Sequence, residues 1–155
     1  MFDGVVSDHA FMAGVYQTVI TPPVGFKIFS PEFPEIVSTS VNDDLLAKVV
    51  TMSTLESELV LIGLDVWGIS DNFEHVLRLA INNAVNPKKT LTVCITVTGN
   101  GCSPILHKVT TEYETYSEYL IEQIVGSVKY AYTNMKPASI GTKSIKFSNV
   151  STFLD

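Results

Sequence analysis

A short loop near the middle of the chain carries most of the side chains that are able to do chemistry. Gly99, Gly101, Cys102 and Ser103 follow a run of alternating apolar residues, and His107 lies further along the same loop. A cysteine thiol with a histidine as its base can attack an ester or amide carbonyl, and the same two side chains can bind zinc. The structural alternative is a surface turn with a packed thiol and a solvated histidine.

Two acidic positions lie close to other expected loops. Asp65 lies near the C-terminal end of an almost wholly apolar segment, LVLIGLDVW, and strand ends of this kind face ligands in α/β proteins. We therefore group Asp65 with Cys102 and His107 as candidate catalytic residues, against the alternative of a structural aspartate that bonds the neighbouring loop. Asp43 and Asp44 either bind a hard cation or cap a turn before the next strand.

Three consecutive segments must position these side chains. Residues 59–67 are nearly all apolar, which is typical of a central strand. Residues 71–85 show the 3.6-residue apolar period of an amphipathic helix, with Asp71 and Glu74 as a capping box. Residues 91–97 alternate apolar and polar side chains, and Cys94 within them is expected to be a buried thiol. A strand, a helix and a strand in this order predict a parallel βαβ unit.

The remaining segments complete a single α/β domain, residues 1–155, with residues 1–11 as a lead-in. Residues 13–20 and 44–52 are expected strands, and residues 53–58 are short enough for a hairpin turn. Residues 115–135 are a long amphipathic helix whose capping box is Thr115 with Glu118. Residues 138–147 are a last strand, and residues 26–40 an irregular, proline-broken coil. Together these segments predict a mixed β-sheet of about five strands with two long helices.

The composition excludes several classes of function. A formal charge of −6 argues against nucleic acid as a partner, because phosphate binding needs a basic patch. No apolar run approaches the roughly 18 residues of a membrane span, and the first residues lack the basic and apolar regions of a secretory signal. Two cysteines make no disulfide framework, so we expect a cytoplasmic protein.

The chain is unusually apolar for its size. Apolar residues make up 46% and charged residues only 17% of the chain. Phe26, Phe29 and Phe33 lie in the proline-broken coil, where no expected helix or strand covers them. Since contiguous apolar surface is rarely left in water, we expect a homo-oligomer that buries this coil or an exposed sheet edge. Packing of the coil on its own sheet is the alternative.

Several ordered segments resemble the neutral/alkaline ceramidase family. They are AGV at residues 13–15, ITPPVG at residues 20–25, VLIGLDVWG at residues 60–68 and YLIEQIVGSVKYAYTNMKPASIG at residues 119–141. They occur in the order in which that family has them, over most of this chain. The resemblance implies an α/β domain and the zinc-dependent hydrolysis of the amide bond of ceramide. It also places further metal ligands downstream of the last residue of this sequence.

The histidines that the resemblance implies are missing here. A histidine-aspartate pair is implied before the second strand, where Asn42 and Asp43 stand. A histidine-rich loop is implied after the fourth strand, where Val97 and Gly99 stand. Catalytic zinc needs about three nitrogen, oxygen or sulfur ligands, and valine and glycine side chains offer none. We therefore expect no cofactor, although the family implies zinc.

Two functional hypotheses follow. The first is a ceramidase-like, non-catalytic binding or assembly module for a small-molecule or lipid-like ligand. The second is a hydrolase of amides or esters with a non-zinc site near residues 98–107. In either case the expected ligand-binding residues come from two loops: Asn42, Asp43, Thr98, Gly99, Asn100, Gly101 and Ser103.

Overall fold

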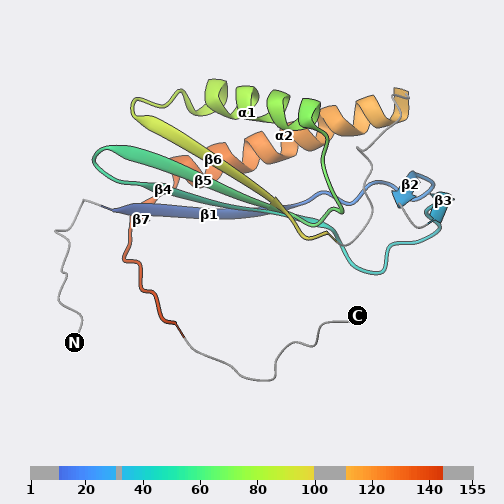
Figure 1. The fold of residues 1–155 in the computed structure, drawn as a ribbon, viewed down its shortest axis with the longest axis horizontal. Helices are drawn as coiled ribbons and strands as arrows, with labels where there is room; N and C mark the ends of the chain where they lie inside the picture. Colours follow the sequence, from blue (N-terminus) through green and yellow to red (C-terminus); the bar gives the residue numbers. More distant parts are fainter. Residues whose placement is uncertain (1–10, 31–32, 100–110, 145–155) are drawn as a thin grey trace, which may run out of the picture.

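The computed structural model describes residues 11–30, 33–99 and 111–144. Within them, two helices cover the same side of a five-stranded sheet (Figure 1). The strand order is β6-β5-β4-β1-β7, and a separate two-stranded ribbon, β2-β3, lies at one end of the sheet. The expected α/β class, with a mixed sheet and two long helices, is confirmed.

The centre of the sheet is an antiparallel pair of hairpin strands. Strand β4 (Leu46–Ser53) pairs with β5 (Ser57–Leu64), and β4 pairs on its other side with β1 (Met12–Val19), again antiparallel. A three-residue connection between β4 and β5 agrees with the turn expected from the polar sequence there. The observed strands are offset from the expected ones by one to three residues, as strand ends often are when read from sequence.

A parallel pair extends the sheet. Strand β5 runs parallel to β6 (Thr90–Val97), and helix α1 (Asp71–Val85) connects them. This is the expected βαβ unit. The N-cap of α1 is Ser70, whose hydroxyl oxygen accepts a hydrogen bond from the Phe73 amide at 3.2 Å. The expected capping box at Asp71 was therefore wrong: Asp71 lies in the first turn, and Glu74 instead pairs with Arg78 one turn on at 2.6 Å.

Helix α2 (Thr111–Thr133) crosses the sheet beside α1. It begins four residues earlier than expected, so Thr115 and Glu118 lie inside the helix and form no capping box. The apolar face was correctly predicted, because its members are all buried: Tyr116, Leu120, Ile124, Val128 and Ala131. Neither helix, over its described residues, is long and apolar enough to cross a membrane.

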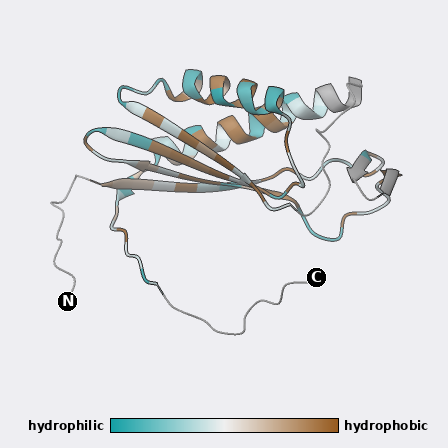
Figure 2. Ribbon diagram, viewed as in Figure 1, coloured by the Kyte–Doolittle hydropathy of each residue, from teal (hydrophilic) through white to brown (hydrophobic). Residues whose placement is uncertain are grey.

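The core lies between the helices and the sheet. It combines alternate residues of β4 and β5 with the inner faces of both helices, and Figure 2 shows hydrophobic residues along nearly all of β5. Alternate side chains of a strand point to opposite faces. An apolar run along β5 therefore supplies side chains to the core and also to the face that the helices leave uncovered.

Two expectations about the segments outside the main elements were wrong. Residues 27–37 contain a hairpin of β2 (Lys27–Ser30) and β3 (Phe33–Val37), where coil was expected. At the base of this hairpin the Ser38 hydroxyl accepts hydrogen bonds from the Gly25 and Phe26 amides at 3.0 and 3.1 Å. The last strand among the described residues is the short β7 (Lys136–Pro137), and residues 138–144 form no strand.

Cys94 is exposed, where a buried thiol was expected. The alternation along β6 places Val93 and Ile95 against the core and Cys94 on the opposite face, which neither helix covers. Residues 1–10, 100–110 and 145–155 lie outside the described residues, as do the expected lead-in and the end of the expected last strand.

Candidate functional site

The loops that sequence analysis favoured gather at one end of the sheet. Strands β1, β5 and β6 end there, β4 begins there, and both helices start from the same end (Figure 1). Backbone hydrogen bonds tie these loops to their neighbours, from Ile20 to Leu45 at 2.8 Å and from Thr98 to Leu64 at 3.1 Å. Side chains from several segments far apart in sequence therefore meet at this end, on a fixed backbone.

Asp65 lies at this end and has structural partners. Its Oδ2 atom accepts a hydrogen bond from the Leu46 amide at 3.2 Å and lies 3.6 Å from the Lys48 ammonium nitrogen. Its own amide donates to the Leu46 carbonyl at 3.0 Å. The carboxylate therefore joins the end of β5 to the start of β4, and its catalytic role stays a prediction.

The acidic loop before β4 is held by a threonine. The Thr21 hydroxyl donates to Asp44 Oδ1 at 2.9 Å and accepts from the Leu45 amide at 2.8 Å. Asn42 is exposed, and its amide nitrogen donates to Asp43 Oδ2 at 2.6 Å. Asp44 and Thr21 thus hold the loop before β4 in place, and a role of Asp43 or Asp44 in binding a cation stays a prediction.

Only the first part of the predicted glycine loop is described. The Thr98 hydroxyl donates to the Val66 carbonyl at 3.5 Å, and Gly99 has a φ of 68°, a left-handed conformation that favours glycine. The remaining predicted site residues of this loop fall outside the described residues: Asn100, Gly101, Cys102, Ser103 and His107. The structure therefore brings together Asp65, Thr98 and the residue 42–44 loop at one end of the sheet, and does not test the cysteine-histidine pair.

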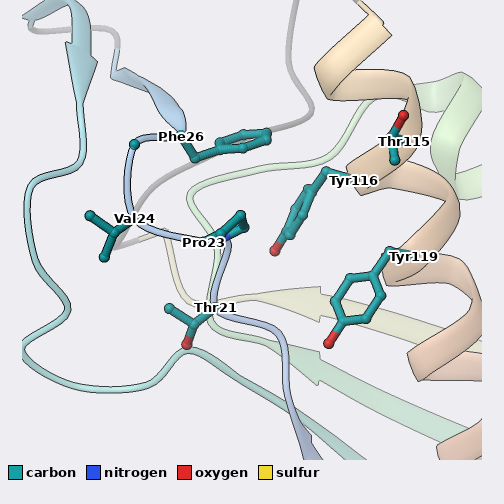
Figure 3. A pocket seen from close by; sticks show the side chains of 8 residues that line it. Thr21, Pro23, Val24, Phe26, Thr115, Tyr116 and Tyr119 are labelled. Carbon is teal, nitrogen blue, oxygen red and sulfur yellow. The ribbon is translucent and has the colours of Figure 1, made fainter.

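A pocket of about 740 Å³ opens at the same end of the molecule (Figure 3). The loop after β1 forms one wall and the first turns of α2 form the other. Its described lining residues carry no charge: Thr21, Pro23, Val24, Gly25, Phe26, Thr115, Tyr116 and Tyr119. Such a volume is in the range of small-molecule sites.

Aromatic rings give this pocket its shape. The rings of Phe26 and Tyr116 lie with centroids 5.2 Å apart at a tilt of 50°, and those of Tyr116 and Tyr119 lie 6.2 Å apart. The Tyr116 hydroxyl donates to the Ile20 carbonyl, so the ring is held by both packing and a hydrogen bond. Figure 3 shows the Tyr119 ring beside that of Tyr116.

Sequence analysis did not assign this pocket. Phe26 was noted only as an apolar residue without a cover, yet it is buried against Tyr116. The sequence signals that were present are Pro22-Pro23 before Phe26, and two tyrosines one helical turn apart at 116 and 119. Nothing in the sequence shows that these segments, about 90 residues apart, face each other.

A second polar cluster lies at the opposite end of the sheet. Glu58, near the start of β5, is buried, and its Oε1 accepts a hydrogen bond from the Tyr132 hydroxyl at 2.8 Å. Burial, and then the hydrogen bond and negative charge of Glu58, raise the pKa of Tyr132 to about 12. Glu58 Oε2 is buried and has no hydrogen-bond partner among the described residues.

The residues present do not fit a zinc ion at the implied histidine positions. Val97 and Gly99 have no donor atoms in their side chains, and the neutral Asn42 amide is bonded to Asp43. Over residues 11–30, 33–99 and 111–144, no three histidine, cysteine or carboxylate side chains form a group that could hold a metal.

Comparison with known proteins identifies the fold. No family model matches the sequence, and no curated protein matches it. Among solved structures, neutral ceramidase from Pseudomonas aeruginosa superimposes with a TM-score of 0.67 at 17% identity, over 84% of this chain and 23% of that one. A ceramidase complexed with C2 superimposes with a TM-score of 0.64 at 17% identity, over 83% of this chain and 22% of that one.

These similarities confirm the ceramidase resemblance at the level of the fold. The chain spans about a quarter of the length of these ceramidases.

Proposed function

We propose that this chain is a ligand-binding module on a ceramidase-like scaffold and not a zinc amidase. The observation that carries the proposal is the uncharged aromatic pocket between the loop after β1 and the start of α2. A concave, mostly apolar site with a few fixed polar groups is typical of small-molecule binding. The scaffold supplies the pocket, whereas the side chains at the implied zinc positions do not supply a metal site.

The pocket chemistry favours an uncharged ligand with an apolar body. Phe26, Tyr116 and Pro23 offer flat or ring surfaces, and the Tyr119 and Thr115 hydroxyls lie at the edge of the same cavity. A ligand with an aromatic ring or hydrocarbon chain and a single hydroxyl or carbonyl group matches this set. A charged ligand would find no opposite charge among the described lining residues, and its desolvation would be uncompensated.

Binding of the neutral, apolar dye Nile red tests the pocket. Dye fluorescence should rise on titration with protein. The Tyr119→Ala variant should bind the dye about tenfold more weakly, since removing one packed ring costs on the order of 1.4 kcal/mol. Tyr130→Ala is the matched control, because Tyr130 is also an exposed tyrosine of α2 but stacks on Tyr16 away from the pocket. Equal affinities of the two variants would contradict the site.

Elemental analysis and an activity assay test the non-zinc part of the proposal. Protein purified without chelator should contain far less than one zinc per chain and should not hydrolyse an N-acylated amine. Stoichiometric zinc together with amide hydrolysis would overturn it. Hydrolysis without zinc that is abolished by Cys102→Ser would instead support the alternative hydrolase, with its site near residues 98–107.

A further inference from the structure

The sheet face opposite the helices is apolar in register across four strands. Backbone pairing aligns Val15 of β1 with Val50 of β4, Val50 with Leu61 of β5, and Leu61 with Cys94 of β6. The next row along the strands is also mostly apolar and consists of Ala13, Met52, Leu59 and Thr92. A third row, on the other side of the Val15 row, consists of Gln17, Lys48, Gly63 and Thr96. We call these three rows together the open face.

Both helices lie on the other side of the sheet and leave this face uncovered (Figure 1). Val15 is 69% exposed, and Cys94 is exposed as well. Val50 and Leu61 are half-buried. Strands β4 and β5 carry apolar residues on both faces, which is typical of strands that are covered on both sides. The sequence of these strands therefore predicts that a second layer of protein covers the open face.

The open face is nearly free of charge, although the chain carries a net charge of −6. The third row contains Gln17, Lys48, Gly63 and Thr96. Lys48 is its one ionisable side chain, and it is already paired with Asp65 at 3.6 Å. The two other rows carry no charge, so a partner covering them needs no complementary charge.

We propose that the open face packs against the open face of a second copy, which gives a twofold homodimer of two stacked sheets. A twofold axis parallel to the strands, between β4 and β5, preserves the rows and exchanges the strands. Val50 then faces Leu61 of the second copy, Val15 faces Cys94 of the second copy, and Lys48 faces Gly63 of the second copy. The single long charged side chain thus meets the position without a side chain.

The size of the open face suits such a dimer. Four strands about 4.8 Å apart and about eight residues long, at about 3.3 Å per residue, give a footprint of roughly 500 Å² on each copy. Two footprints total about 1,000 Å², the lower limit for a specific interface. Sheets that stack face to face lie about 10 Å apart with strands nearly aligned, which is compatible with this axis.

Sedimentation equilibrium and chemical cross-linking test the proposal. The mass should rise from 17.0 kDa toward twice that value between about 1 and 100 μM, a range that matches a weak, small interface. Val15→Lys should weaken association at least tenfold, while Leu79→Lys, at a 52% exposed position of α1, should leave it unchanged. Far-UV circular dichroism checks that both variants are folded.

Chemical cross-linking distinguishes this dimer from one built on another surface. Facing positions on sheets about 10 Å apart are too distant for a disulfide, so a short bismaleimide, which joins two thiols across a gap, is the reagent. In a Cys102→Ser background, Val15→Cys should be cross-linked to Cys94 of the second copy. Positions 15 and 94 are three strands apart within one sheet, roughly 14 Å, beyond the reach of the same short reagent. Leu79→Cys in the same background is the control. A constant mass of 17.0 kDa, or a dimer that V15K does not weaken and V15C does not cross-link, would overturn the proposal.

Discussion

Gly14 of β1 and Ala131 of α2 set the distance between the helix and the sheet. A Cβ atom built on Gly14 would lie 2.0 Å from the Ala131 carbonyl oxygen and 2.9 Å from its carbonyl carbon. Real atoms do not approach this closely, so only glycine allows the helix backbone to rest on the strand. Thr51, in the adjacent strand, uses the same space to donate its hydroxyl to the Gly14 carbonyl at 3.3 Å.

Gly14→Ala should therefore destabilise the fold. The added methyl group meets backbone and not a flexible side chain, so either α2 or β1 must shift. We expect a loss of about 2–3 kcal/mol in the free energy of unfolding, in the range for overpacked cores. Urea denaturation measures it. Gly126→Ala is the control: it lies in α2 with nothing within 4 Å of its Cβ position, and it should gain about 0.5–1 kcal/mol. A Gly14→Ala variant as stable as the wild type would show that α2 and β1 are packed less tightly than this.

Tyr132→Phe should also lower stability. The change removes the hydroxyl that donates to Glu58 Oε1 and leaves a buried carboxyl group with neither oxygen bonded among the described residues. Loss of a hydrogen bond to such a group costs roughly 1–3 kcal/mol. Thermal unfolding of the two proteins at pH 7 gives the difference. Tyr130→Phe, on the same helix but exposed, should change little.

The same tyrosine predicts a pH dependence. Its pKa is raised from 10.0 to about 12 in the folded protein, so the unfolded chain releases this proton first. Its contribution is present in full below pH 10 and is lost as the pH rises through about 12. The stability difference between wild type and Tyr132→Phe should therefore shrink over this interval. A difference that stays constant between those pH values would contradict the assignment.

We predict that the Asp65 side chain stabilises the fold. Asp65→Ala removes the acceptor for the Leu46 amide, and we expect a loss of about 1–2 kcal/mol. Lys48→Ala removes only the partly exposed ion pair, so its loss should not exceed about 1 kcal/mol. Asp65→Asn keeps an acceptor oxygen and should lie between the two. Urea denaturation separates these cases, and an Asp65→Ala variant as stable as wild type would leave the carboxylate open to a chemical role.

The N-cap of α1 is a local interaction that can be tested separately. Ser70→Ala removes the oxygen that accepts from the Phe73 amide, which should cost about 1 kcal/mol of stability. Asp71→Ala should cost less, because Asp71 only adds a negative charge to the first turn. Denaturation curves of the two variants measured side by side decide between Ser70 and Asp71 as the cap.

Local patterns in the sequence determined the regular elements. The bounds of α1 follow from its apolar period and from Pro87 beyond its end, and the observed helix spans the predicted residues 71–85. The buried face of α2 follows from the same period. The parallel pairing of β5 with β6 follows from a strand, a helix and a strand in succession. The resemblance to ceramidases, carried by short ordered segments, agrees with the fold found by superposition.

Only the tertiary structure decided which distant residues meet. Alternation along β6 assigns two faces but does not say which is covered, so Cys94 was expected to be buried although it lies on the open face. Nor does the sequence show that Phe26 packs on Tyr116, or that Gly14 lies against Ala131. These contacts join segments about 90 or more residues apart, and they form only once the layers pack. The pocket and the open face both result from that packing.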